Sequence, residues 1–356
     1  MEIRELLTLA IKKGASDIHF LADKPPYIRV HGELAPLPQF QILTDKDVER
    51  IVLSIMTPEQ KTVFLQEKEL DYSYVVPGVD ADGDARFRVN AYAQRNSFAA
   101  SLRHIPNKIR TFEELALPPS LSELAKLRQG FVLLTGPTGQ GKSTTLATII
   151  HEINKNRKAH IITIEDPVEY TYPAAKAIIS QRELRVDTYS WKASLRAILR
   201  EDPDVVLVGE MRDLETIAAA LTIAETGHLV FSTLHTNSAA QTIDRIIDVF
   251  PEHQQGQIRQ QLASVLSAVI CQRLVSSTAE VRVPALEILI STTAVRTSIR
   301  EGKTHLIDNI IQTSKDVGMI SFEEYFSELV TSGKVTLEVA ERHVSRPTEL
   351  RRYLKK

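Results

Sequence analysis

One complete phosphate-binding motif restricts the possible folds of this chain more than any other feature of its sequence. The motif begins at Gly136, ends at Ser143, reads GPTGQGKS and matches the pattern GxxxxGK[ST] at every fixed position. Apolar residues 131–135 before it indicate a buried strand, and residues 142–154 indicate a helix. A strand that passes through a glycine-rich loop into a helix predicts a P-loop in an α/β fold.

The residue types in this loop fit the chemistry of nucleotide binding. Its glycines let backbone N–H groups close on phosphate oxygens, and the helix N-terminus favours negative charge. We expect the lysine to reach the β- and γ-phosphates and the serine hydroxyl to bind Mg²⁺. The predicted nucleotide-binding set is Gly136, Pro137, Thr138, Gly139, Gln140, Gly141, Lys142, Ser143 and Thr144.

The rest of the chain suggests two domains joined by a proline-marked linker at residues 106–119. Residues 1–105 predict a small α+β domain. It begins with a helix ended by Gly14 and extended stretches at 17–20 and 27–31, followed by a helix from Thr44 to residue 56 and another from Thr57. Alternating strands with a polar turn at 80–84 complete it. In residues 120–356, the apolar runs 160–165, 204–209 and 229–234 predict strands buried on both faces of a parallel sheet. Residues 286–356 predict mostly helix.

Acidic residues follow two of the predicted strands. Glu210 stands shortly after the run 205–208, which we expect to lie next to the P-loop strand, and so occupies the position of a Walker-B acid near the metal. Glu165 ends the run 160–165, Asp166 and Glu169 follow it, and one of these carboxylates could act as general base for an attacking water. For Asp166 we favour a simpler role as a turn-capping residue before Pro167.

Histidines and arginines near these strands are further candidates. His228 and His235 bracket the run 229–234, and a role in sensing the γ-phosphate competes evenly with a structural role. Arg196, Arg200 and Arg212 flank the strand before Glu210. They are either solvated surface residues or arginine fingers that reach phosphates of a neighbouring subunit.

Composition excludes several classes of protein. The net charge of -2 provides no global basic field, so we expect no nucleic-acid partner. Cys271 is the only cysteine, which excludes an internal disulfide and a cysteine-based zinc site and favours a reducing compartment. No apolar run approaches the roughly 20 residues of a membrane span, and the first helix has no signal-peptide core. These features predict a cytoplasmic protein.

Taken together, the motifs resemble those of the secretion and pilus ATPase superfamily, and most closely its type IV pilus retraction ATPases. The four motifs that carry this resemblance are GPTGQGKSTT (Walker A), TIEDPVEY (Asp box), DVVLVGEMRD (Walker B) and GHLVFSTLHT (His box). Residues 15–20 and 85–92 resemble the family's N-terminal PAS-like domain, and residues 294–301 resemble its retraction signature. The resemblance implies a PAS-like α+β domain followed by a RecA-like P-loop ATPase domain with C-terminal helices.

The resemblance also implies roles for individual residues. Lys142 and Ser143 would hold phosphate and Mg²⁺, and Glu210 would be the Walker-B acid and a second metal ligand. Glu169 would be the catalytic glutamate, and His228 and His235 would belong to the His box. Arg88 and Arg103 resemble arginines that approach the nucleotide phosphates.

The implied assembly is a homohexameric ring that hydrolyses ATP and powers pilus retraction and twitching motility. Its implied place is the cytoplasmic face of the inner membrane, with a pilus platform protein and in some systems a second retraction ATPase as partners. Two departures from the family pattern stand out. Gln140 replaces the usual serine, with little effect expected, and the retraction signature has Val295, Thr297 and Ser298 where the family has Ile, Asn and Leu.

Four alternatives compete with this interpretation. A pilus assembly or type II secretion ATPase would usually carry a four-cysteine zinc element and a further N-terminal domain, which one cysteine and 356 residues exclude. The departures in the signature leave an accessory retraction paralogue open. A signalling GTPase or small-molecule kinase is disfavoured because the stretch at 154–157, NKNR, lacks the aspartate of guanine recognition. A ring that binds ATP without hydrolysing it is disfavoured by the presence of both Glu169 and Glu210.

Overall fold

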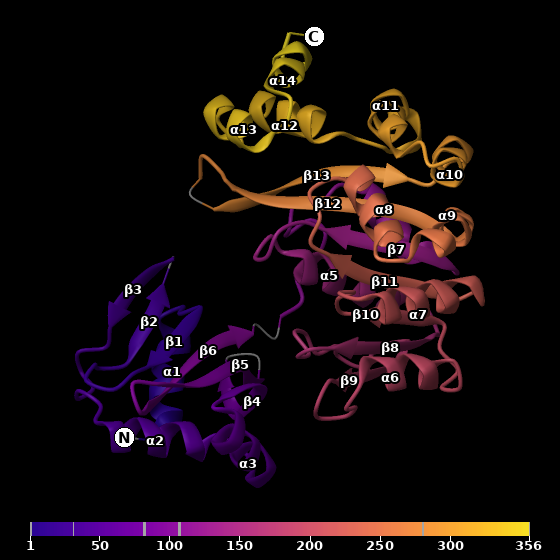
Figure 1. Cartoon of the computed structure of the whole chain (residues 1–356). Helices are drawn as coiled ribbons and strands as arrows, with labels where there is room; N and C mark the ends of the chain where they lie inside the picture. Colours follow the sequence, from indigo (N-terminus) through magenta and orange to yellow (C-terminus); the bar gives the residue numbers. More distant parts are fainter. Residues whose placement is uncertain (1, 31, 81–82, 106–107, 280, 356) are drawn as a thin grey trace. The chain divides into compact units, whose positions relative to one another are not determined.

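The computed structural model describes residues 2–30, 32–80, 83–105, 108–279 and 281–355, which form two compact units (Figure 1). The first unit comprises Met1–Ile109 and Pro167–Thr171, and the second comprises Arg110–Asp166 and Tyr172–Lys356. The chain thus passes from one unit to the other within the segment 106–119, and residues 110–119 belong to the second unit. Pro106 lies outside the described residues.

The first unit is an antiparallel sheet with three helices. The strand order is β3-β2-β1-β6-β5-β4. The strands are β1 (Asp17–Phe20), β2 (Tyr27–Val30), β3 (Glu33–Pro36), β4 (Glu69–Asp80), β5 (Gly83–Gln94) and β6 (Ser97–Ile105), and the helices are α1 (Ile3–Lys12), α2 (Asp45–Ser54) and α3 (Pro58–Glu67). Capping boxes begin α2 at Thr44 with Asp47 and α3 at Thr57 with Gln60, so both predicted helix starts are confirmed.

Several details of this unit differ from the sequence expectation. α2 ends at Ser54 rather than at residue 56, and the short strand β3 was not predicted. The predicted strand 27–31 is described as far as Val30, because His31 lies outside the described residues. Asp80 and Gly83 pair across the β4–β5 hairpin. The two residues between them, which belong to the predicted turn at 80–84, also lie outside the described residues.

The second unit is built on a seven-stranded sheet in the order β13-β12-β7-β11-β10-β8-β9. All neighbouring strands are parallel except β13, which is antiparallel to β12. The strands are β7 (Gly130–Thr135), β8 (His160–Glu165), β9 (Ile178–Glu183), β10 (Val205–Val208), β11 (Leu229–Leu234), β12 (Leu266–Ser276) and β13 (Arg282–Ile290). The four strands predicted from apolar runs, β7, β8, β10 and β11, are therefore confirmed as members of one parallel sheet.

Helices connect and cover these strands. Before and between the parallel strands lie α4 (Ser120–Glu123), η1 (Leu124–Lys126), α5 (Lys142–Asn156), α6 (Trp191–Ile198), α7 (Leu214–Glu225), α8 (Ala239–Asp248) and α9 (Glu252–Val265). After β13 come α10 (Thr293–Arg300), η2 (Thr304–Leu306), α11 (Ile307–Thr313), η3 (Lys315–Val317), α12 (Phe322–Thr331), α13 (Leu337–His343) and α14 (Pro347–Tyr353). None of the helices in the described ranges is both long and apolar enough to cross a bilayer.

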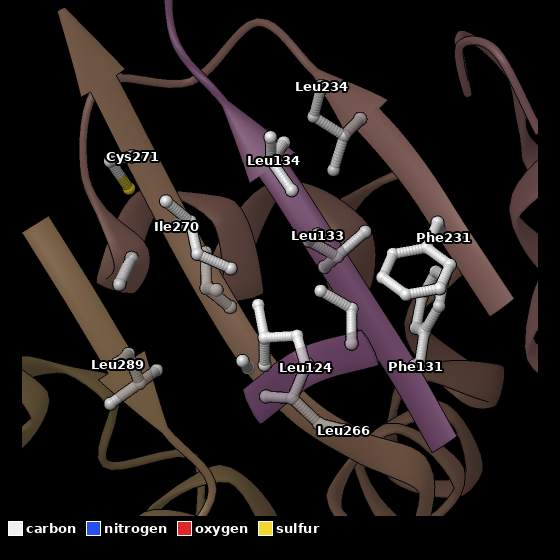
Figure 2. Packing of buried hydrophobic residues seen from close by; sticks show 14 of the residues in the cluster. Leu124, Phe131, Leu133, Leu134, Phe231, Leu234, Leu266, Ile270, Cys271 and Leu289 are labelled. Atoms are coloured by element: carbon white, nitrogen blue, oxygen red, sulfur yellow. The ribbon is translucent and has the colours of Figure 1, made fainter. Parts of the chain in front are cut away.

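The core of the second unit lies against the central strands of the sheet. Every residue of β7 and β11 is buried, which explains why their sequences do not alternate between apolar and polar. Figure 2 shows Phe131 of β7 beside Phe231 of β11, and Ile270 of β12 on the opposite side of β7. Fully burying a side chain of this size contributes about 1.5–3 kcal/mol, so these strands are held firmly in place.

The expectation of helix from residue 286 needs a correction at its start. Residues 286–290 form the second half of β13, which pairs antiparallel with β12. Five of the six residues at 285–290 are apolar, and pairing with the preceding strand β12 decided their conformation in a way that the periodicity of this segment alone does not reveal. Helices follow from Thr293 onwards, and α12 packs against β13 (Figure 1).

A buried carboxyl group lies on this last strand. Glu287 pairs across the ladder with Cys271, whose thiol accepts a hydrogen bond of 3.0 Å from the Thr135 hydroxyl. One oxygen of Glu287 accepts a hydrogen bond of 2.8 Å from the backbone N–H of Ala239, at the start of α8. Burial raises the pKa of Glu287 to about 7, opposed by the Ala239 hydrogen bond and reinforced by Asp308 and Glu323, while Arg346 lowers it.

We predict that Glu287→Gln stabilises the protein more at pH 8 than at pH 5. Because the pKa of Glu287 is raised on folding, its contribution to stability falls as the pH rises from the ordinary range of about 4.5 through about 7. Glutamine can still accept the Ala239 hydrogen bond but carries no charge. Thermal unfolding of both proteins at the two pH values measures the difference in Tm.

Glu301→Gln is the matched control. Glu301 is fully exposed and Lys303 lowers its pKa, so it stays ionised between pH 5 and 8 and its replacement should show no such trend. A Tm difference for Glu287→Gln that is the same at pH 5 and pH 8 would contradict the assignment.

Candidate phosphate site

The candidate site lies at the edge of the sheet where the parallel strands end. β7 runs directly into the P-loop, and the loop leads into the N-terminus of α5. In open α/β sheets, ligands bind outside the carboxyl ends of the strands. β11, β10 and β8 end at the same edge, because each runs parallel to its neighbour in register.

The backbone of the P-loop has the shape that its glycines permit. Gly136, Gly139 and Gly141 have φ angles of +139°, +77° and +78°, a region that side chains with a Cβ rarely adopt. The ammonium group of Lys142 is turned inward and donates to the backbone oxygens of Gly136 (2.7 Å) and Pro137 (3.0 Å). The loop therefore curves around its own lysine.

Neighbouring strand β12 supports this loop. The side-chain amide of Gln272 donates to the backbone oxygen of Gln140 (2.7 Å), and its carbonyl accepts from the Thr145 hydroxyl (2.8 Å). The Gln140 side chain in turn accepts a hydrogen bond of 2.6 Å from the backbone N–H of Leu274. The sequence consensus leaves position 140 free and does not point to Gln272, but both residues anchor the loop.

A chain of polar contacts joins the P-loop to the predicted Walker-B acid. One oxygen of Glu210 lies 3.1 Å from Nε2 of His235, and the other accepts a hydrogen bond of 2.9 Å from Arg212. Nδ1 of His235 lies 3.5 Å from the Thr138 hydroxyl in the loop. Four of the predicted site residues are thus brought together within one unit.

This arrangement differs from the sequence expectation in one respect. Glu210 was expected at the end of a strand next to the P-loop strand, but β11 lies between β7 and β10. His235, directly after β11, fills the gap between the loop and the acid. The backbone around Glu210 is fixed to the same strand, since the Thr233 hydroxyl donates to the Gly209 oxygen and the Met211 N–H donates to the Thr233 oxygen.

The carboxyl group of Glu210 is ionised in these surroundings. Burial alone would raise its pKa, but the hydrogen bond and charge of Arg212, with the charges of His235 and Lys142, outweigh burial and lower it. Arg212 itself keeps a side chain that is 74% exposed, so the pair lies at the surface of the site. A carboxylate that stays charged at neutral pH is suited to a cation.

His228 is not brought to this site. It precedes β11, at the amino ends of the parallel strands, where its Nδ1 lies 3.1 Å from the Ile223 oxygen and 3.0 Å from the Thr226 hydroxyl. Strands advance about 3.3 Å per residue, so the two histidines that bracket β11 are about 20 Å apart. Within this unit, the structure places His228 away from the P-loop and gives it a structural contact.

Arg196 and Arg200 also lie apart from this contact chain. Arg196 is on α6 and Arg200 follows that helix, and both are exposed. Neither side chain forms a hydrogen bond or ion pair with any residue in the described part of the chain. Arg212 differs from both because it pairs with Glu210 of the same chain.

The acidic group after β8 is divided between the two units. Glu165 is buried at the end of β8 and accepts a hydrogen bond of 2.7 Å from the Thr163 hydroxyl. Asp166 is exposed, in agreement with a loop position. Glu169 lies in the segment Pro167–Thr171, which groups with the first unit. Its catalytic role remains a prediction.

Arg88 and Arg103 are neighbours on the sheet of the first unit. Arg88 of β5 is directly opposite Arg103 of β6, and Arg103 is opposite Asp17 of β1. Arg103 donates a hydrogen bond of 2.9 Å to Asp17. Burial alone would raise the pKa of Asp17, but the hydrogen bonds from Arg103 and Ser16 and the charges of Arg103 and His19 outweigh burial and lower it. The predicted contact of both arginines with nucleotide phosphates remains a prediction.

The residues of the P-loop unit fit a Mg²⁺–nucleotide complex. Gly141 is the N-cap of α5 and offers no side chain to the first N–H groups of the helix, which suits an anion. In the described ranges, no cluster of three or more His, Cys, Asp or Glu side chains could hold a metal by itself. Mg²⁺ usually binds through one or two protein groups together with substrate phosphates. Ser143, at the start of α5, and Glu210 are the residues predicted to supply those groups.

Comparison with known proteins identifies the family. The model of the Type II/IV secretion system protein family matches residues 2–342. The type IV pilus retraction ATPase PilT of Pseudomonas aeruginosa is 45% identical over 347 residues, which cover 98% of this chain and 99% of that protein. The type IV pilus ATPase PilU of the same species is 38% identical over 356 residues, covering 100% of this chain and 92% of PilU.

A solved structure shows the same fold over the whole chain. The crystal structure of the pilus retraction motor PilT with bound ADP is 44% identical, with a TM-score of 0.91 and coverage of 99% of both chains. The chain therefore belongs to the Type II/IV secretion system protein family, on the branch of the type IV pilus retraction ATPases.

Proposed function

We propose that this protein is an ATP-hydrolysing motor that drives type IV pilus retraction. The observation that carries the proposal is the contact chain from Thr138 through His235 to Glu210, beside the inward-turned Lys142, in a chain similar over its full length to PilT. A P-loop alone indicates nucleotide binding. An ionised acid held near that loop by a neighbouring strand supports hydrolysis.

Each residue has a chemical role in this proposal. Lys142 exchanges its two backbone carbonyl partners for the β- and γ-phosphates of ATP. Ser143 and Glu210 would hold Mg²⁺, which would supply positive charge against the phosphates. Glu169 accepts the proton of the attacking water, and His235 keeps the Glu210 carboxylate oriented.

The finer picture of the molecule also belongs to this proposal. We infer that the first unit is the PAS-like domain and the second the RecA-like domain, assembled as a homohexamer. The position of the ring is the cytoplasmic face of the inner membrane, against a pilus platform protein. Support comes from the full-length similarity to PilT.

An accessory retraction motor is the second candidate. The observation that favours it is the altered retraction signature, in which Val295, Thr297 and Ser298 depart from the family pattern. The similarity to PilU, at 38% identity, is lower than that to PilT. Deletion of the gene separates the two, since loss of a main motor abolishes twitching whereas loss of an accessory motor leaves part of it.

We predict that Lys142→Ala lowers ATP turnover by at least about 100-fold, because it removes the cation that stabilises the phosphates. In cells that carry only this variant, pili should accumulate and twitching should stop. Lys155→Ala is the control, since Lys155 is exposed near the other end of the same helix. Hydrolysis by purified Lys142→Ala near the wild-type rate would refute the proposed site.

We predict that Glu169→Gln binds ATP but hydrolyses it about 100-fold more slowly or worse, since glutamine cannot accept the proton of water. Glu165→Gln is the comparison. Its carboxyl group is buried and hydrogen-bonded to Thr163, and we expect a smaller loss of turnover from it. If Glu165→Gln alone traps ATP, the general base is Glu165. Nucleotide titrations and phosphate release measure the two properties separately.

Helix α10 carries the segment that resembles the retraction signature, and it has one buried and one exposed face. Val295, Ser298 and Ile299 are buried, whereas Arg296 and Arg300 are exposed. The helix packs against α9. Within the described residues, the side-chain hydrogen bonds of the two arginines are short-range, from Arg296 to Ser291 and from Arg300 to Thr297.

We predict that replacing Arg296 and Arg300 together with alanine leaves most ATPase activity but stops retraction in cells. The exposed arginines are available to a partner and do not support the fold. Replacing the exposed Arg351 and Arg352 of α14 removes the same charge elsewhere and serves as control. Normal retraction by the Arg296, Arg300 variant would exclude α10 as the output surface.

A further inference from the structure

Strand β12 continues beyond the end of the strand that carries the P-loop. The last residue pair between the two strands is Cys271 with Thr135, after which β7 turns into the loop. β12 extends to Ser276, and its residues Gln272 and Leu274 contact the P-loop where β7 no longer does. The loop therefore rests on the part of β12 that continues past β7, where β12 is still paired with β13.

Gln272 is fitted closely to the loop. It is 2% exposed and bonds to both Gln140 and Thr145. A Cβ at Gly136 would lie 2.3 Å from the backbone oxygen of Gln272, and one at Gly141 would lie 3.0 Å from its side-chain nitrogen. With so little free space, a movement of the loop backbone has to be matched by a movement of β12.

The next residue of β12 makes its contacts on the C-terminal helices. The guanidinium carbon of Arg273 lies 4.5 Å from the centre of the Phe322 ring, at the start of α12. The same group donates a hydrogen bond to the backbone oxygen of His343, the last residue of α13. Successive residues of a strand point to opposite faces, so one short stretch of β12 contacts the P-loop on one side and α12 and α13 on the other.

We propose that β12 is a relay that passes the state of the P-loop to helices α12 and α13 through the consecutive residues Gln272 and Arg273. The relay rests on the proposed function in one respect, namely that nucleotide binds at the P-loop. Gln272 is the positioning residue on the loop side, and Arg273 is the positioning residue on the helix side. The C-terminal helices thus respond to nucleotide without touching it.

Coupling of this kind must act in both directions. If nucleotide binding changes the docking of α13, then weakening that docking changes nucleotide affinity by the same factor. Two sites coupled through one element typically affect each other by about 5-fold to 150-fold. Both directions can be measured on the full chain.

The experiment follows amide hydrogen exchange in residues 322–343, with and without Mg²⁺ and ADP, together with ADP titration. In the wild type we expect ADP to change exchange in these helices. In Arg273→Ala and in Gln272→Ala we expect that change to vanish and the Kd for ADP to shift about 5-fold or more. Gln272→Ala leaves the contacts of Arg273 in place, so it tests the relay even if Arg273→Ala loosens the helices.

Arg342→Ala is the matched control. Arg342 lies on α13 and pairs with Glu338 on the exposed surface of the same helix, so this variant should keep the ADP-dependent exchange and the wild-type Kd. Unchanged exchange in a wild-type protein that does bind ADP would overturn the relay alone. A wild-type protein that binds no ADP would overturn the proposed function and the relay with it. An ADP response retained in both Gln272→Ala and Arg273→Ala would also overturn the relay.

Discussion

The site depends on the way in which β7 is held between two parallel strands. β11 pairs with it residue by residue on one side and β12 along most of its length on the other, and all six of its residues are buried. Sliding β7 along its axis would break both ladders and expose apolar side chains. Its end is therefore fixed relative to the ends of β11 and β10, and this brings Thr138, His235 and Glu210 together from three separate segments.

Features that short stretches of sequence encode were predicted well. The glycines of the P-loop, the apolar runs of β7, β8, β10 and β11, and the capping residues Thr44 and Thr57 each act on neighbours within a few residues. Glu210 and His235 were found because both follow buried strands of one parallel sheet, and such strands end at a common edge. The main polar residues of the site could therefore be predicted from the sequence even though the strand order could not.

Features that depend on which strands pair with one another were missed. β13 takes its conformation from β12, and Gln272 is recognisable as a P-loop support only once β12 is known to lie beside β7. His228 is a different case, since strand length alone separates the two ends of β11 by about 20 Å. The sequence already contained the signal that His228 and His235 occupy opposite edges of the sheet.

At the edge of the sheet where the site lies, the burial of strand side chains and the exposed ion pairs contribute very different amounts to stability. The strands are fixed by burial, at about 1.5–3 kcal/mol for each large side chain, whereas an exposed ion pair such as that of Arg212 with Glu210 contributes about 0–1 kcal/mol. A charged ligand can therefore rearrange the side chains of the site while the sheet beneath keeps its register. Strand β12 pairs with β13 along nearly its whole length, but its pairing with β7 ends at Cys271, and the residues after it contact the P-loop and the C-terminal helices. In the proposed relay, a change in the P-loop reaches α12 and α13 through this part of β12. The pairing of β7, β11 and β10, which positions the site, stays unchanged.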